Sequence, residues 1–142
     1  MIPSRIIIHH SATEDSGTVS WVAIRHYHTV VLHWSDIGYH AGCELVKNVD
    51  NAYYEVLMGR MWDIVGAHAE GQNSDSLGFC FVGDFDKIKP PAKQLIAGAK
   101  ALKLWMKLFN IGMNNIYRHS DFSPKTCPGS RFDLEILKAL LE

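Results

Sequence analysis

The segment RIIIHH, residues 5–10, does most to decide the fold of this chain. Three consecutive isoleucines form a continuous apolar run, which is typical of a strand buried on both faces of a sheet. Two histidines stand where this strand gives way to the polar segment SAT. Because side chains alternate between the two faces of a strand, His9 and His10 cannot both point at the same ligand. The pattern alone does not choose between them.

Helical patterns follow in three places. A helix is expected over 18–32, because its apolar residues fall on one face and Thr18 can cap its start. A second helix is expected after the prolines at 90 and 91, with NIG at its end. A third is expected over 131–141, where Ser130 and Asp133 make a start that resembles a capping box.

Short strands are expected between these helices. Two of them form a hairpin around the turn-rich segment KNVDN. The interleaving of strands and helices predicts an α/β fold, with a single mixed β-sheet flanked by helices on its faces. The predicted strands are 39–46, 52–58, 76–85 and 115–119.

Composition and charge restrict the function classes. With 47% hydrophobic and 20% charged residues and no low-complexity tract, we expect one globular domain over residues 1–142, with a monomer as the default. A net charge of −1 gives no electrostatic reason to expect nucleic acid. No apolar run reaches the roughly 18–20 residues that a membrane span needs. The start of the chain does not resemble a signal peptide, so we expect synthesis in the cytoplasm.

The loop HSDFSPKTCPG, residues 119–129, holds a histidine and a cysteine eight residues apart. Cys80 sits among apolar neighbours, whereas Cys127 lies in a polar, proline-rich loop beside Lys125. Three cysteines at wide spacings leave at least one thiol free or bound to metal. A nearby ammonium lowers the pKa of a thiol, and His119 could be a base or a second ligand. The residues alone leave an incidental thiol, a nucleophile and a metal ligand all open.

Most of the other histidines are expected to be ordinary. His28 falls on the apolar face of the first helix and is expected to be a core residue, while His40 is expected to be structural. His26 and His33 are expected at the surface. Asn73 is expected to make a turn.

Six segments together resemble the zinc-dependent N-acetylmuramoyl-L-alanine amidases, the family that includes phage endolysins and animal peptidoglycan recognition proteins. They keep the family's order and spacing from about residue 5 to residue 133. The resemblance implies hydrolysis of the amide bond between N-acetylmuramic acid and L-alanine in bacterial peptidoglycan. The segments are IIIHHSAT, IRHYH, WSDIGYH, GR, VGAHAEGQNSDSLGFCFVGDF and HSDFSPKTCPG.

The resemblance also implies roles for single residues. His9, His119 and Cys127 match the family's ligands for one zinc ion, with water as the fourth ligand. Tyr39 matches the active-site tyrosine; we expect it to orient water and relay a proton, because a hydroxyl with a pKa near 10 is a poor base. Lys125 is expected to stabilise the oxyanion, and His68 to contact the substrate.

Departures from the family pattern indicate which branch of the family this chain resembles. The cytosolic recycling amidases have aspartate and glutamate where this chain has Cys127 and Cys80, which favours the endolysin or recognition-protein branch. The hairpin lacks the usual DG turn and carries an unexpected Cys43. We therefore expect a phage or prophage enzyme that acts on peptidoglycan or muropeptides after release from the cytoplasm. The alternatives are a non-catalytic recognition module and a cysteine hydrolase that uses Cys127 and His119.

Overall fold

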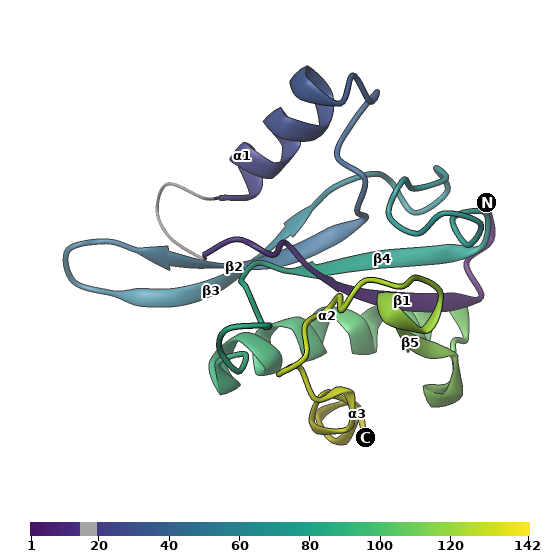
Figure 1. The fold of residues 1–142 in the computed structure, drawn as a ribbon. Coiled ribbons are helices and arrows are strands. Elements are labelled where there is room, and N and C mark those ends of the chain that lie inside the picture. Colours follow the sequence, from purple (N-terminus) through teal and green to yellow (C-terminus); the bar gives the residue numbers. More distant parts are fainter. Residues whose placement is uncertain (15–19) are drawn as a thin grey trace.

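Five strands form one mixed sheet in the order β3-β2-β4-β1-β5 in the computed structural model, which describes residues 1–14 and 20–142 (Figure 1). β1 lies parallel between β4 and β5, β2 lies parallel to β4, and β3 pairs antiparallel with β2. The predicted single mixed sheet is confirmed. The strands are β1 (Arg5–His10), β2 (Ala41–Lys47), β3 (Ala52–Met58), β4 (Ser76–Phe81) and β5 (Ile116–Arg118).

The three isoleucines of β1 are fully buried, as the continuous apolar run predicted. Ile6 and Ile8 belong to the larger core, together with Phe79 of β4. Cys80 points to the opposite face, where it packs in a smaller core with Trp21. Since a parallel strand in the middle of a sheet must be covered on both sides, this burial requires structure on each face.

Helices supply that cover. α1 (Trp21–His26) lies on one face of the sheet, whereas α2 (Ala92–Phe109) and α3 (Leu134–Leu141) lie on the other (Figure 1). The predicted flanking of the sheet by helices is confirmed. None of the helices in the described part of the chain is long and apolar enough to cross a membrane.

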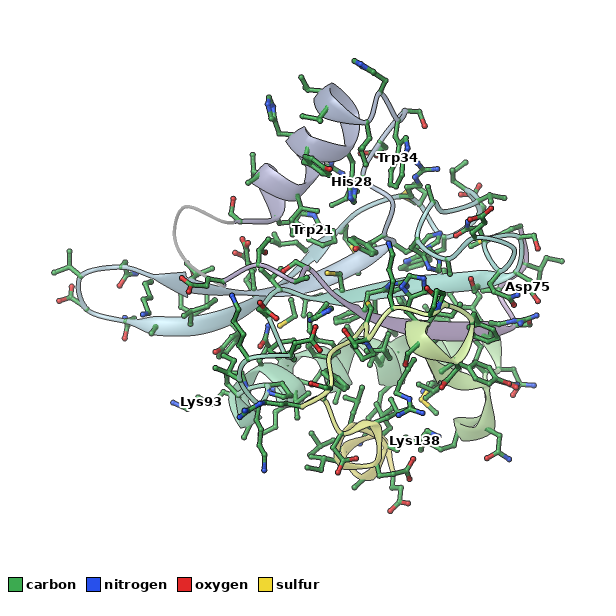
Figure 2. The ribbon with its side chains drawn as sticks, in the orientation of Figure 1. Trp21, His28, Trp34, Asp75, Lys93 and Lys138 are labelled. Carbon is green, nitrogen blue, oxygen red and sulfur yellow. The ribbon has the colours of Figure 1, made fainter. Side chains whose placement is uncertain are left out.

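The first helix is held by its cap and by a tryptophan. The Oγ of Ser20 accepts a hydrogen bond from the Ala23 amide at 3.4 Å, and the helix continues as a π-helical turn, η1 (Tyr27–Val31). The cap predicted at Thr18 lies outside the described residues. Trp21 sits between α1 and the sheet (Figure 2), against Gly42, where a Cβ atom would collide with its ring. This close approach fixes α1 over β2.

The predicted boundaries of later elements need two corrections. β4 ends at Phe81, four residues before the predicted end at 85. α3 begins at Leu134, because Asp133 is its N-cap and accepts a hydrogen bond from the Glu135 amide at 2.9 Å. Ser130 does not start the helix, since its amide donates to Asp86 Oδ1 at 2.7 Å. The second helix ends as predicted, with Asn110 in the left-handed conformation.

The two edges of the sheet differ. β5 has only three residues, and its two outward amides have partners: the Ile116 amide donates to Met113 O, and the Arg118 amide donates to Asp121 Oδ2 at 2.9 Å. β3 has seven residues, most of them exposed, and pairs with β2 alone among the described residues. Neighbouring residues therefore satisfy the outward amides of β5, whereas the longer β3 has only β2 as a paired strand in the described part of the chain.

Candidate metal centre

The sheet topology brings His9 and His119 together. β1 and β5 are parallel, so their carboxyl ends meet at the same edge of the sheet. Ile8 is in register with Arg118, and each strand then supplies a histidine as its next residue. His119 begins a short 3-10 turn, η3 (His119–Asp121), and its ring centroid lies 4.6 Å from that of His9.

Cys127 completes the cluster from the loop after η3. One ligand atom from each of His9, His119 and Cys127 lies within 4.8 Å of the other two. The Sγ of Cys127 is 3.7 Å from His9 Nδ1. Sulfur and nitrogen ligands of one tetrahedral zinc lie about 3.6 Å apart, given bond lengths of about 2.3 and 2.05 Å. The donor set and its spacing therefore fit a zinc ion.

The surroundings of the thiol support this fit. Cys127 is 8% exposed, and its Sγ accepts a hydrogen bond from the His10 amide at 3.4 Å. An N–H that points at sulfur stabilises a thiolate more than a thiol. The loop is fixed at this point by the Ser120 amide, which donates to the Cys127 carbonyl at 2.7 Å.

The sheet also distinguishes the two adjacent histidines. His9 lies beside Cys80, on the α1 side of the sheet. His10 points to the opposite side, where its Nδ1 accepts a hydrogen bond from the Phe85 amide at 3.1 Å and its ring stacks on that of Phe85. Of the two histidines, only His9 reaches the cluster.

Burial sets the protonation of the cluster. The pKa of His9 is lowered well below its ordinary value, mainly by burial and then by His68 and His119. The pKa of His119 is lowered by burial and by the Lys125 ammonium. Burial raises the pKa of the Cys127 thiol to about 11, although the His10 amide and Lys125 oppose the rise. The metal-free cluster thus holds neutral imidazoles, ready to bind, and a thiol whose proton a metal must displace.

Tyr39 and Lys125 lie beside this cluster. Tyr39 precedes β2, and its ring centroid is 5.2 Å from that of His9. Burial and the nearby Cys80 and Cys127 raise the pKa of the Tyr39 hydroxyl well above its ordinary value, so it stays protonated at neutral pH. Lys125 is exposed and lies two residues before Cys127; its positive charge favours lower pKa values for His9, His119 and the Cys127 thiol.

His68 lies behind His9 and not in the open. It is 8% exposed, and its Nδ1 is 3.0 Å from His9 Nε2. The sequence predicted a contact with substrate and missed this pairing. The one local sequence signal for the position of His68 is Asn73, which is predicted to make a turn. Its Oδ1 accepts hydrogen bonds from the His68 and Ala69 amides, and these bonds fix the backbone at His68.

Two more buried histidines are structural, as predicted. His28 Nδ1 accepts a hydrogen bond from the Gly38 amide, and His40 Nδ1 accepts one from the Gly78 amide, both at 3.0 Å. His26 and His33 are exposed, also as predicted.

The buried histidines predict acid sensitivity of the metal-free protein. Burial lowers the pKa values of His28 and His40, whereas in the unfolded chain both return to about 6.5. The unfolded state therefore binds more protons, so this stability is complete above pH 6.5 and is lost as the pH falls. We expect the free energy of unfolding to fall between pH 7 and pH 5, by at most about 1.4 kcal/mol per pH unit for each histidine.

Urea unfolding of the chelator-treated protein at pH 7.5, 6.0 and 5.0 measures this. The His28→Leu variant should show a smaller pH dependence, because leucine does not titrate. An unfolding free energy that stays constant down to pH 5 would contradict the expectation.

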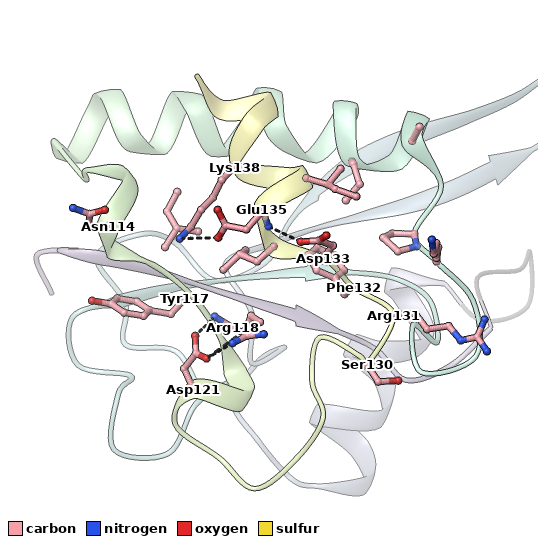
Figure 3. A pocket seen from close by; sticks show the side chains of 17 residues that line it. Asn114, Tyr117, Arg118, Asp121, Ser130, Arg131, Phe132, Asp133, Glu135 and Lys138 are labelled. Atoms are coloured by element: carbon pink, nitrogen blue, oxygen red, sulfur yellow. Dashed lines mark hydrogen bonds and ion pairs between the residues drawn. The ribbon is translucent and has the colours of Figure 1, made fainter.

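The large surface depression in Figure 3 is a different feature. It has a volume of about 1050 Å³ and lies against β5 and α3, and none of the cluster residues lines it. Two ion pairs lie among its lining side chains: Arg118 Nη2 lies 3.1 Å from Asp121 Oδ1, and Lys138 Nζ lies 3.6 Å from Glu135 Oε1. The depression is therefore separate from the histidine–cysteine cluster.

Comparisons with known proteins agree with the geometry. The sequence is 35% identical to an endolysin of Klebsiella phage KP32 over 135 residues, which is 93% of this chain and 83% of the endolysin. It is 42% identical over 103 residues to peptidoglycan-recognition protein 2 of Holotrichia diomphalia, and this match covers 69% of the chain but only 51% of that protein.

A solved structure shows the same fold. The N-acetylmuramoyl-L-alanine amidase LysC from Clostridium intestinale URNW superposes with a TM-score of 0.80 at 28% identity, over 99% of this chain and 85% of that one. The sequence family described as N-acetylmuramoyl-L-alanine amidase matches residues 1–130. With its histidine–cysteine cluster in place, the chain therefore belongs to the N-acetylmuramoyl-L-alanine amidase family.

Proposed function

We propose that this protein is a zinc-dependent amidase that cleaves the bond between N-acetylmuramic acid and L-alanine in peptidoglycan. The observation that carries the proposal is the convergence of His9 Nδ1 and Cys127 Sγ at 3.7 Å, with His119 in reach of both. Three protein ligands leave a fourth position open, which is the arrangement of catalytic zinc sites. When bound, zinc supplies a Lewis acid that makes water nucleophilic at neutral pH and polarises the carbonyl group.

Two further side chains act on the reacting atoms in this proposal. The Tyr39 hydroxyl is protonated, so it orients the attacking water by a hydrogen bond and passes a proton on, and does not act as the primary base. The Lys125 ammonium, whose charge acts on His9 and Cys127, stabilises the negative charge that develops on the carbonyl oxygen. In this proposal the thiol is a ligand: burial raises its pKa to about 11, and a bound metal would displace its proton.

The biological setting is part of the same proposal. Residues 1–142 form one catalytic domain whose partner is peptidoglycan or a muropeptide. The similarity to a phage endolysin supports a phage or prophage enzyme, made in the bacterial cytoplasm and acting on the wall after release. We propose that it acts as a monomer, with no partner beyond the substrate.

Purified protein incubated with peptidoglycan tests the activity. We expect new L-alanine amino termini to appear, to be lost on addition of a chelator and to return when zinc is restored. Muropeptides that carry intact stem peptides serve as the substrate for quantitative rates.

Each other outcome selects another function. Release that survives the removal of zinc would reject the metal centre and favour a cysteine hydrolase based on Cys127 and His119. Binding to peptidoglycan without release, with zinc bound, would indicate a recognition module, the kind of protein named by the Holotrichia diomphalia relative.

A further inference from the structure

We infer that His68 is a positioning residue that holds His9 in the one tautomer able to bind the metal. The inference starts from the two ring nitrogens of His9. Nδ1 faces Cys127 Sγ at 3.7 Å, and Nε2 lies 3.0 Å from His68 Nδ1. A neutral imidazole carries one proton, so Nδ1 can be a ligand only if the proton sits on Nε2. His9 then donates this proton to His68 Nδ1.

The direction of this hydrogen bond, from His9 to His68, is set by the contacts that His68 makes with Ser76 on its other ring nitrogen. His68 Nε2 lies 3.4 Å from both the carbonyl oxygen and the Oγ of Ser76, and Ser76 Oγ donates to the Gln72 carbonyl at 2.6 Å. A carbonyl oxygen can only accept, so the Ser76 hydroxyl proton points at Gln72 and its lone pairs face His68. His68 therefore carries its proton on Nε2, and its Nδ1 is free to accept from His9.

The structure also provides a slot for the His68 ring. A Cβ atom at Gly78 would lie 2.5 Å from His68 Cγ, and one at Gly66 would lie 2.6 Å from His68 Cδ2. Because both residues are glycines without a Cβ atom, the His68 ring can pack directly against their backbone. The His68 amide is tied to Asn73 Oδ1 at 2.9 Å, which fixes the ring at its root.

Protein atoms enclose the His68 ring in this slot, away from a polymeric substrate. It is 8% exposed, and its ring is enclosed by His9 on one side and by His40 on another, with ring centroids 5.0 and 5.6 Å away. A residue in this place acts on the reaction through the ligand it orients. Partners of this kind change metal affinity or activity by about 10–100-fold when they are removed.

This inference rests on the proposed metal site, and its first test does not need the metal. The ring nitrogen shifts of His9 in the zinc-free protein, read by long-range ¹H–¹⁵N NMR, should show the proton on Nε2. A proton on Nδ1 in the wild-type protein would overturn the inference, even if the protein proved to be a zinc amidase.

The second test measures zinc affinity by competition with a chromophoric chelator. We expect His68→Leu to weaken zinc binding about 10–100-fold and to give a mixture of His9 tautomers. His68→Asn should recover most of the affinity, because Oδ1 of asparagine can replace Nδ1 as the acceptor. His28→Leu removes a buried histidine that packs against Tyr39 and bonds the Gly38 amide, and it should leave zinc affinity within about twofold of wild type.

The outcomes separate the possible roles of His68. If zinc affinity stays at the wild-type value in His68→Leu and only KM rises, His68 contacts substrate and the inference is wrong. If His68→Leu does not fold, His68→Asn and the wild-type tautomer still decide. Activity that resists chelation would reject the proposed function, whereas the tautomer result would still stand.

Discussion

Replacing Cys127 with alanine is expected to abolish stoichiometric zinc binding and to lower amidase activity at least about a thousandfold, which corresponds to about 4 kcal/mol of transition-state stabilisation. The reason lies in the geometry of the site. Cys127 supplies the one anionic ligand, and without it two neutral imidazoles hold the ion alone. Zinc content by elemental analysis and the release of L-alanine termini measure the two effects.

Cys43→Ala is the matched control for this substitution. Cys43 is also a fully buried thiol, but it belongs to the core on the α2 side and donates to the Gln94 carbonyl at 3.8 Å. We expect zinc content and activity within about twofold of wild type, with only a small loss of stability of about 1 kcal/mol.

The Cys127→Asp variant distinguishes a ligand from a nucleophile. A carboxylate oxygen can bind zinc, whereas it cannot replace a thiolate in attack on an amide. We expect partial activity that follows zinc content. Full zinc binding by Cys127→Ala would contradict the assignment of Cys127 as a ligand.

Removing either group that acts on the reacting atoms should leave the metal in place and reduce turnover. We expect Tyr39→Phe and Lys125→Ala each to keep one zinc per chain and to lose about 10²–10³-fold in kcat. Tyr39→Phe loses only the hydroxyl, whereas Lys125→Ala loses the ammonium together with the aliphatic chain that carries it. Steady-state kinetics on soluble muropeptides, together with zinc content, measure these effects.

A conservative variant at Lys125 and a control variant away from the cluster test these roles further. Lys125→Arg should recover part of kcat because it keeps the charge, whereas Tyr27→Phe removes an exposed hydroxyl on η1 and should have no effect. A raised KM with an unchanged kcat would assign the affected residue to substrate binding and not to catalysis.

Elements with a strong local pattern could be predicted from the sequence. The isoleucine run marks a strand buried on both faces, and the long amphipathic stripe of α2, with the prolines before it, defines that helix almost to the residue. The start of α3 could not be predicted, because Ser130 and Asp133 are both good N-caps by local criteria. Asp86, 44 residues away, decides between them by accepting from the Ser130 amide.

In the site, too, the features that depend on contacts distant in sequence could not be predicted. The alternation of side chains along β1 predicts that His9 and His10 point to opposite faces of the sheet. Which of the two joins the cluster depends on which face α2 covers. The pairing of His68 with His9 spans 59 residues and depends on the bare backbone of Gly78, and neither leaves a local pattern. The ligand set, by contrast, was reached through the family resemblance, and the structure brings those three side chains together.

The unequal edges of the sheet limit how copies of this protein can associate. At β5, the Asp121 side chain and the Met113 carbonyl already hold the amides that a new strand would need. Within residues 1–14 and 20–142, β3 pairs with no strand except β2, and Tyr53 and Val56 are exposed along it. An association of strand on strand can therefore join two copies through β3, but the pair then presents only β5 edges and cannot grow. If copies of this protein did pair through this edge, the association would stop at a dimer and would not propagate into fibres.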